Sequence, residues 1–202
     1  GVSFEGTKWK DASFEDYVTD WVDTAKLVAA VKPAFMEANL SCPNEGTAAL
    51  LCFDIERVKT ISSQVKNAIG DMPLWLKISY FTDQTLLEEL VKEVGPIVDG
   101  FATINTISAE VRTPDGGQAL PGEGRLRSGV CGHAIKWAGV DMVKRFVTLR
   151  EQNNLNFNVI GVGGVTEADD YHEYVAAGAD AVMSATGAMW NPQLAKDIKQ
   201  TL

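Results

Sequence analysis

The chain has 202 residues, of which 46% are hydrophobic and 22% charged, a composition typical of a single soluble globular domain. Its 27 Asp and Glu residues outnumber its 18 Lys and Arg residues, so the net charge of −9 argues against nucleic acids and anionic membranes as main partners. No apolar stretch reaches the roughly 20 residues that span a bilayer, and the start of the chain lacks the pattern of a signal peptide.

Short apolar runs alternate with longer amphipathic segments along the chain. We expect strands at residues 2–4, 34–39, 73–79, 98–104, 157–162 and 181–184. We expect helices at residues 13–31, 53–69, 86–94, 137–152, 166–177 and 193–202. Two of these helices begin with a predicted capping box, formed by Ser13 with Asp16 and by Thr166 with Asp169.

This order repeats a strand-helix unit six times, which predicts a parallel sheet with right-handed crossovers in one domain over residues 1–202. Six units fit an open doubly wound sheet, and a complete TIM barrel needs eight. However, polar or glycine residues follow five different strands, whereas an open sheet concentrates them at one switch point. We therefore favour an incomplete barrel, with residues 106–130, which hold five glycines and two prolines, as a long loop.

The last two strands lead into glycine-containing turns. GVGG places Gly163 and Gly164 between a strand and a helix, and the next strand ends in Ala185, Thr186 and Gly187. Backbone amides and a helix amino end can bind a phosphate there, although a simple tight turn explains GVGG about equally well. The spacing is not that of the dinucleotide-binding fingerprint.

Several polar residues point to a ligand rather than to packing. Lys77 lies inside the strand LWLKIS, where an ammonium group is costly unless an anion pairs with it. The amides of Asn39, Asn44 and Asn105 can each donate and accept hydrogen bonds, which suits a planar ligand with amide and carboxylate groups. Any one of these asparagines could equally be a turn former.

The chain has three cysteines and two histidines, and their spacing predicts neither a disulfide framework nor a metal site. Free thiols are typical of a reducing compartment such as the cytoplasm. Cys42 follows a strand in a polar loop, which favours a functional role over packing. Cys52 lies in an apolar segment and is expected to be inert. Cys131 precedes Gly132 at a helix start, where a thiol could be activated, but packing or a backbone contact is the expected role.

The motifs NLSCPN, KIS, TINT, VIGVGG and VMSATG, in this order, resemble the class 1 dihydroorotate dehydrogenases over essentially the whole chain. The resemblance implies a TIM barrel that binds FMN and oxidises dihydroorotate to orotate in pyrimidine biosynthesis, in a cytoplasmic homodimer. It implies that Cys42 is the base and that Asn39, Asn44, Asn105 and Thr106 bind the substrate. It places Lys77, Gly132, Gly163, Gly164, Ala185 and Thr186 at the FMN, and leaves the role of Ser41 open.

The chain departs from the family pattern in three places. Ala185 stands where the family usually has Gly, and Thr106 stands where it often has Ser. The chain also begins at what corresponds to the third barrel strand, so the first two strand-helix units have no counterpart in this sequence. Two alternatives stay open beside the main prediction: an FMN reductase of another dihydropyrimidine or an enoate, and a catalytically poor barrel that binds a phosphorylated ligand. The electron acceptor is also open.

Overall fold

The centre of the molecule is a parallel sheet of six strands. A computed structural model describes residues 1–7, 9–41 and 50–202. The strands in the sheet are β1 (Val2–Phe4), β2 (Met36–Asn39), β3 (Leu74–Ile78), β4 (Gly100–Thr103), β7 (Asn158–Val162) and β8 (Ala181–Met183). Their order across the sheet is β1-β2-β3-β4-β7-β8, and every neighbouring pair is parallel.

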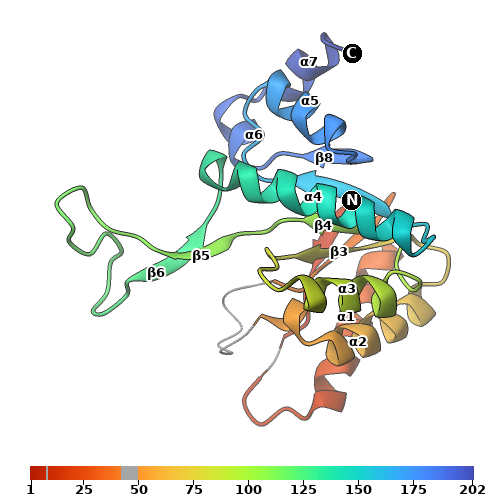
Figure 1. The fold of residues 1–202 in the computed structure, drawn as a ribbon. Helices are drawn as coiled ribbons and strands as arrows, with labels where there is room; N and C mark the ends of the chain where they lie inside the picture. The colour runs from red at the N-terminus through yellow and green to blue at the C-terminus, as the bar shows by residue number, and fades with distance from the viewer. Residues whose placement is uncertain (8, 42–49) are drawn as a thin grey trace.

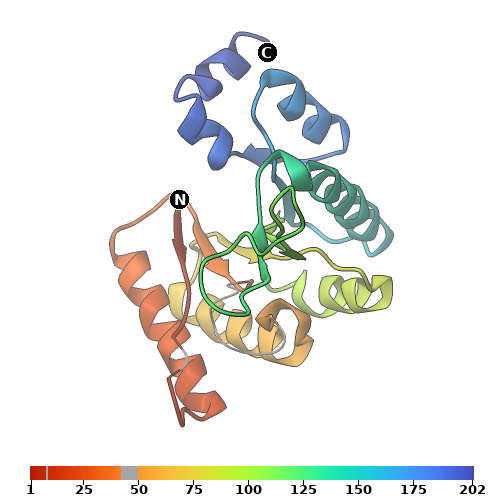
Figure 2. The same ribbon diagram turned by 90° about the vertical axis from the view of Figure 1, so that its left-hand side faces the viewer.

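The strand order distinguishes the two architectures that fit the sequence, an open doubly wound sheet and a barrel. Each new strand is added on the same side as the one before, whereas a doubly wound sheet reverses direction at a switch point. The helices follow one another around the outside of a curled sheet (Figures 1 and 2). This architecture is a partial TIM barrel, as predicted, in which β1 and β8 are the two edge strands.

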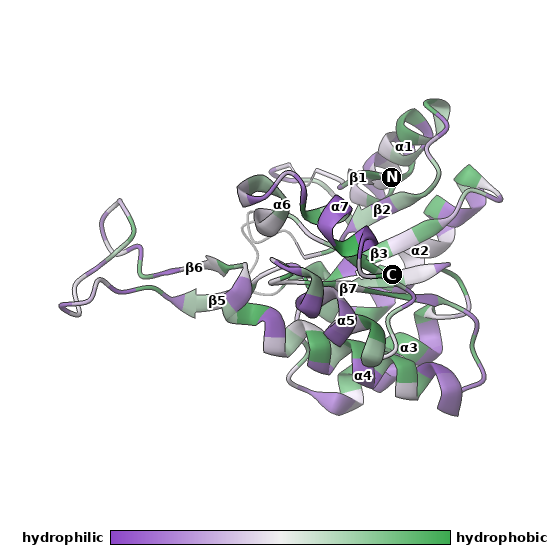
Figure 3. Cartoon of the chain, turned by 90° about the horizontal axis from the view of Figure 1, so that it is seen from above, coloured by the Kyte–Doolittle hydropathy of each residue, from purple (hydrophilic) through white to green (hydrophobic). Residues whose placement is uncertain are grey.

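The helices are amphipathic and cover the outer face of the sheet. They are α1 (Phe14–Ala30), α2 (Ile55–Ile69), α3 (Gln84–Val94), α4 (Lys136–Gln152), α5 (Ala168–Ala176), α6 (Thr186–Trp190) and α7 (Leu194–Lys199), with short 3₁₀ turns η1 (Leu51–Phe53) and η2 (His133–Ile135). In α2 the buried residues Ile55, Val58, Ile61 and Val65 recur at helical spacing. In Figure 3 the long helices carry both hydrophobic and hydrophilic residues. Among the described residues, no helix is both long and apolar enough to span a bilayer.

The first predicted capping box is confirmed and the second is wrong. Ser13 Oγ accepts a hydrogen bond from the backbone of Asp16, and the Asp16 carboxylate accepts one from the backbone of Ser13. At α5 the carboxylate that caps the helix belongs to Asp170, which is buried, and Asp169 is exposed. The spacing rule chose the wrong one of two adjacent aspartates because α5 begins two residues later than predicted, at Ala168.

The segment 106–130 contains structure that the sequence did not predict. Strands β5 (Ile107–Glu110) and β6 (Arg127–Val130) pair antiparallel and form a hairpin, which projects from the body of the molecule (Figures 1 and 3). The connection contains the turn signal Pro114-Asp115-Gly116, around which Arg112 and Gln118 form an antiparallel bridge. The sequence prediction did not use this signal and described the segment as a loop. The hairpin returns the chain to the sheet at Cys131 and Gly132.

The carboxyl-terminal part also differs in detail from the prediction. The sequence analysis described Thr186 and Gly187 only as residues at the end of a strand. In the structure they begin the short helix α6, which covers residues 186–190. The closing helix α7 is limited to Leu194–Lys199, whereas a helix over residues 193–202 was predicted. These differences do not move the strand ends, which set the position of the candidate site.

Candidate functional site

A cavity of about 260 Å³ opens at the carboxyl ends of the strands. Its walls come from β3, from the segments that follow β4, β6, β7 and β8, and from the start of α6. The lining residues are Lys77, Ile104, Asn105, Thr106, Cys131, Gly132, Ile135, Val162, Gly163, Gly164, Val165, Ser184, Ala185, Thr186 and Gly187. This is the end of the fold at which TIM barrels build their active sites.

The structure gathers most of the sequence-predicted site residues around this one cavity. All six predicted cofactor residues line it, namely Lys77, Gly132, Gly163, Gly164, Ala185 and Thr186. Of the predicted substrate residues, Asn105 and Thr106 line it, and Asn39 lies beside it in contact with Asn105. Cys42 and Asn44 lie outside the described residues. The ligand roles of all these residues stay predictions.

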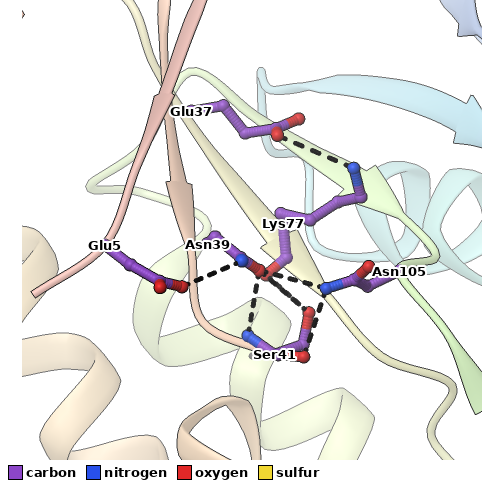
Figure 4. A network of polar contacts seen from close by, with 6 residues as sticks. All are labelled: Glu5, Glu37, Asn39, Ser41, Lys77 and Asn105. Atoms are coloured by element: carbon purple, nitrogen blue, oxygen red, sulfur yellow. Dashed lines mark hydrogen bonds and ion pairs between the residues drawn. The ribbon is translucent and has the colours of Figure 1, made fainter. Parts of the chain in front are cut away.

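A network of polar side chains ties Asn39 to the edge of the cavity (Figure 4). Asn105 Nδ2 donates to Asn39 Oδ1 at 3.2 Å and to the backbone oxygen of Ser41 at 3.1 Å. Asn39 Nδ2 donates in turn to Glu5 Oε2 at 3.2 Å. The network joins the chain just after β1, β2 and β4, so the amide groups of Asn39 and Asn105 hold each other in fixed orientations.

Glu37 is a buried charged residue that the sequence analysis did not single out. Its carboxylate lies 3.6 Å from Lys77 Nζ, and the side chains of Lys77 and Glu37 are 15% and 9% exposed (Figure 4). The sequence predicted that Lys77 needs an anion, and a carboxylate of the chain itself supplies one. Strand alternation could have identified Glu37, because it stands two residues before Asn39 and therefore faces the same side of the strand.

We expect Lys77→Met to destabilise the fold by about 2 kcal/mol, because it leaves the Glu37 side chain buried without its ion-pair partner. The measurement is urea unfolding at neutral pH. The double variant Lys77→Met/Glu37→Gln should regain most of the loss, since the unpaired charge is then absent. Lys92→Met, on an exposed face of α3, is the matched control. Equal losses in the single and double variants would show that the pairing contributes nothing.

The loop from Gly163 to Glu167 is held in place by groups around the cavity. Gly163 and Gly164 have φ angles of +125° and +70°, which glycine adopts without strain. The Ser184 hydroxyl donates to the backbone oxygen of Val165 at 2.7 Å. Asp170 Oδ2 accepts from the backbone N–H and the hydroxyl of Thr166, both at 2.8 Å, and from the N–H of Glu167 at 3.2 Å.

Asp170 also carries a buried ion pair that joins α5 to α4. Lys136 Nζ lies 2.7 Å from Asp170 Oδ1 and 2.8 Å from Glu173 Oε2. Burial raises the pKa of Asp170, but the hydrogen bonds from Lys136 and Thr166 lower it more, so that its pKa falls to about 2. The same contacts, that with Asp170 first, hold the pKa of Lys136 above its usual range. Both groups are therefore charged at neutral pH and keep this wall of the cavity fixed.

The two described cysteines differ in environment. Cys52 is fully buried, and burial raises the pKa of its thiol to about 12, which agrees with the predicted inert packing role. Cys131 is exposed, lines the cavity and lies with its Sγ 3.8 Å from the Thr186 hydroxyl, so packing, the first of the two roles expected for it, is wrong. Cys131 lies at the cavity because it directly follows β6, which ends there.

Comparison with known proteins agrees with the fold. Residues 2–202 match the family model described as dihydroorotate dehydrogenase. The dihydroorotate dehydrogenase of Dictyostelium discoideum is 32% identical over 198 residues, covering 96% of this chain and 53% of that protein. A Pediococcus pentosaceus protein assigned to dihydroorotate dehydrogenase A (fumarate) is 33% identical, covering 91% of this chain and 58% of its own length.

One further relative and one solved structure also match this chain. The catalytic subunit of dihydroorotate dehydrogenase B (NAD(+)) of Staphylococcus carnosus is 29% identical, covering 90% of this chain and 55% of that protein. Among solved structures, the DHODH of Eimeria tenella in complex with ferulenol matches with a TM-score of 0.76 at 16% identity, over 96% of this chain and 55% of that one, which shows a shared barrel fold.

The chain spans little more than half the length of these relatives, and the match runs through all of its strands. The fumarate and NAD(+) types among the relatives agree with the class 1 resemblance of the motifs. With a family model that matches almost every residue, the chain belongs to the dihydroorotate dehydrogenase family.

Proposed function

We propose that this chain carries the FMN and substrate sites of an enzyme that oxidises dihydroorotate to orotate in pyrimidine biosynthesis. Enzymes of this family are FMN-dependent oxidoreductases that act on CH–CH bonds. The observation that carries the proposal is the cavity itself. Segments that follow four different strands meet there, and they include the glycine loop and Asn105. Lys77 reaches the same place from β3.

The residues present fit FMN. A phosphate accepts hydrogen bonds from backbone amides, and Gly163 and Gly164 both line the cavity, where their backbone can meet a ligand. At Gly132, which has φ +78°, a Cβ would extend into open space, so a ligand can approach the backbone there. We assign Gly132, Gly163, Gly164, Ala185 and Thr186 to the ribityl-phosphate. We assign Lys77 to the flavin ring, where its cation can stabilise negative charge.

The polar network supports the part of the substrate site that contains Asn39 and Asn105. We assign Asn39, Asn44, Asn105 and Thr106 to the pyrimidine ring and its carboxylate. Asn105 uses only its Nδ2 in the network of Figure 4, which leaves its Oδ1 able to accept a hydrogen bond from a ring N–H. Since Asn39 fixes the orientation of that amide, the two asparagines act together in recognition.

The base we propose is Cys42, whose thiolate removes the proton from C5 of dihydroorotate. Bound FMN supplies the acceptor for the hydride that leaves C6, and the double bond of orotate forms between these two carbons. Ser41, the residue before Cys42, is buried and hydrogen-bonded to Asn105 beside the cavity. The Cys52 N–H donates to the Leu40 oxygen at 2.9 Å. Leu40 and Cys52 therefore lie together at the end of β2.

The test is anaerobic addition of dihydroorotate to the 202-residue chain loaded with FMN. We expect flavin absorbance near its visible maximum to bleach as the substrate is oxidised. Dihydrouracil and a simple enoate serve as competing substrates in separate samples. Bleaching by dihydrouracil alone would assign the chain to another dihydropyrimidine. Binding of FMN or of inorganic phosphate without any bleaching would favour a barrel that binds a phosphorylated ligand.

The setting of the reaction is part of the proposal. We place the protein in the cytoplasm as a homodimer, as expected of the class 1 branch. Reoxidation by fumarate or through an NAD-linked partner are the two routes that the names of the relatives offer. Mixing the reduced protein with fumarate separates them, because only the first route restores the yellow colour without a partner subunit.

A further inference from the structure

Tyr174 connects the interior of helix α5 to the glycine loop at the cavity. Its side chain is fully buried, and its Oη donates a hydrogen bond of 2.7 Å to the backbone oxygen of Gly163. Gly163 lines the cavity, whereas Tyr174 does not. A hydroxyl that is buried this deeply normally satisfies a buried acceptor, and here that acceptor belongs to a loop proposed to bind phosphate.

The backbone around Tyr174 leaves room for this ring and for nothing larger. A Cβ at Gly161 would lie 2.3 Å from Tyr174 Cδ1, and a Cβ at Gly139 would lie 2.0 Å from Tyr174 Oη. These two glycines come from different elements, β7 and α4, and each makes space for the same side chain. The hydroxyl therefore reaches the Gly163 oxygen through a slot that two separate elements leave open.

The hydrogen bond fixes the orientation of one peptide group. In a planar trans peptide, the C=O of one residue and the N–H of the next point in opposite directions. Because the Gly163 oxygen faces Tyr174, the N–H of Gly164 points away from Tyr174, and Gly164 itself lines the cavity. That N–H has no hydrogen-bond partner among the described residues, whereas the Thr166 N–H is bound by Asp170 and the Val165 oxygen by Ser184.

The loop has no intrinsic means of keeping this orientation. Two consecutive glycines impose little torsional preference, so the peptide between them can rotate at low cost when nothing holds it. A rotated peptide would point the Gly163 oxygen, a hydrogen-bond acceptor with negative partial charge, at the position of a phosphate. The Tyr174 hydroxyl prevents this by binding that oxygen on the opposite side.

We propose that Tyr174 is a positioning residue that aims the Gly164 amide at the phosphate of the bound flavin. The inference rests on the proposed function, since FMN is the ligand whose phosphate the amide would bind. Tyr174 does not touch the ligand; it acts through the Gly163 peptide. It therefore distinguishes ligands with a phosphate from those without one.

The test compares Tyr174→Phe with the control Tyr171→Phe, which removes a hydroxyl from the same helix at a position that lines no part of the cavity. Fluorescence titration gives the Kd of each variant for FMN and for riboflavin, which lacks the phosphate. Losing one buried hydrogen bond should weaken FMN binding by about five- to tenfold and leave riboflavin binding unchanged. Urea unfolding of both variants checks that the fold is retained.

The outcomes separate the inference from the proposed function. An unchanged Kd for FMN in Tyr174→Phe, or an equal loss for FMN and riboflavin, overturns the positioning role. If the unaltered chain binds no flavin, the proposed function fails, and inorganic phosphate then serves as the probe. A downfield shift of the Gly164 amide proton on adding phosphate, present in the unaltered chain and absent in Tyr174→Phe, supports the role of Tyr174 independently. No shift in either protein overturns it.

Discussion

Cys42→Ala is expected to slow anaerobic reduction of bound FMN by dihydroorotate by about a thousandfold while FMN stays bound. The reason is that a positioned general base contributes roughly 10²–10⁴-fold to a proton transfer, and alanine cannot accept the C5 proton. FMN binding should be unaffected because the residues assigned to the phosphate and the flavin ring lie on other strand ends. Stopped-flow absorbance of the flavin, with the FMN content measured beforehand, gives the rate.

Cys52→Ala is the matched control, since it removes a thiol ten residues away that is fully buried in the core. It should unfold more easily by about 1 kcal/mol because of the small cavity, and it should reduce flavin at the rate of the unaltered chain. Rapid flavin reduction by Cys42→Ala would exclude Cys42 as the base, and loss of FMN would assign it a structural role.

Asp170→Asn is expected to lower the free energy of unfolding by about 3 kcal/mol at neutral pH. Asparagine keeps the shape and one acceptor oxygen, but the substitution leaves Lys136 with only the half-exposed Glu173 as its counter-ion. Asp169→Asn, one residue earlier and exposed, should change stability by less than about 0.5 kcal/mol. Urea unfolding of the two variants also tests which aspartate caps α5. Similar losses in both would contradict the assignment to Asp170.

The acid dependence of stability follows from the same carboxylate. The folded pKa of Asp170, about 2, lies below its value of 3.8 in the absence of these contacts. Its contribution is therefore complete above about pH 4 and is lost as the pH falls toward 2, with a total of roughly 2 kcal/mol. Unfolding of Asp170→Asn measured across this range should show a correspondingly weaker dependence on pH. Parallel curves for the two proteins would show that Asp170 does not titrate as described.

Much of the fold and of the candidate site could be predicted from local patterns. Helical spacing of apolar residues placed α2, and the Ser13–Asp16 spacing placed the start of α1, because these features depend on neighbours a few residues apart. Polar residues after successive strands predicted that they would meet, since parallel strands bring their carboxyl ends to one edge. The cavity residues Asn105 and Thr186 follow strands in this way, whereas Gly132 is placed at the site only by the family resemblance.

The features that were missed depend on contacts between distant parts of the chain. The pairing of β5 with β6 has a local turn signal in Asp115-Gly116, but that signal does not set the register of two strands that lie far from the turn. The arrival of Cys131 at the cavity and the choice of Asp170 over Asp169 have no local signal. Glu37 was within reach of a strand-alternation argument, but its partner Lys77 becomes its neighbour only through the pairing of β2 with β3. Pairing of this kind is selected by the packing of the whole sheet.

The sequence by itself determined the order of the six strand-helix units, the barrel class and the kinds of side chain at the ends of their strands, because periodicity, caps and turn residues act over short distances. Only the tertiary structure decided which charges pair and which glycines make room for a ring. Gly139, Gly161 and Tyr174 are far apart in the chain, and they form one slot only after α4 and α5 pack against β7. The Tyr174 hydroxyl holds the Gly163 peptide because it is buried against the oxygen of that peptide. This burial is a property of the packed molecule.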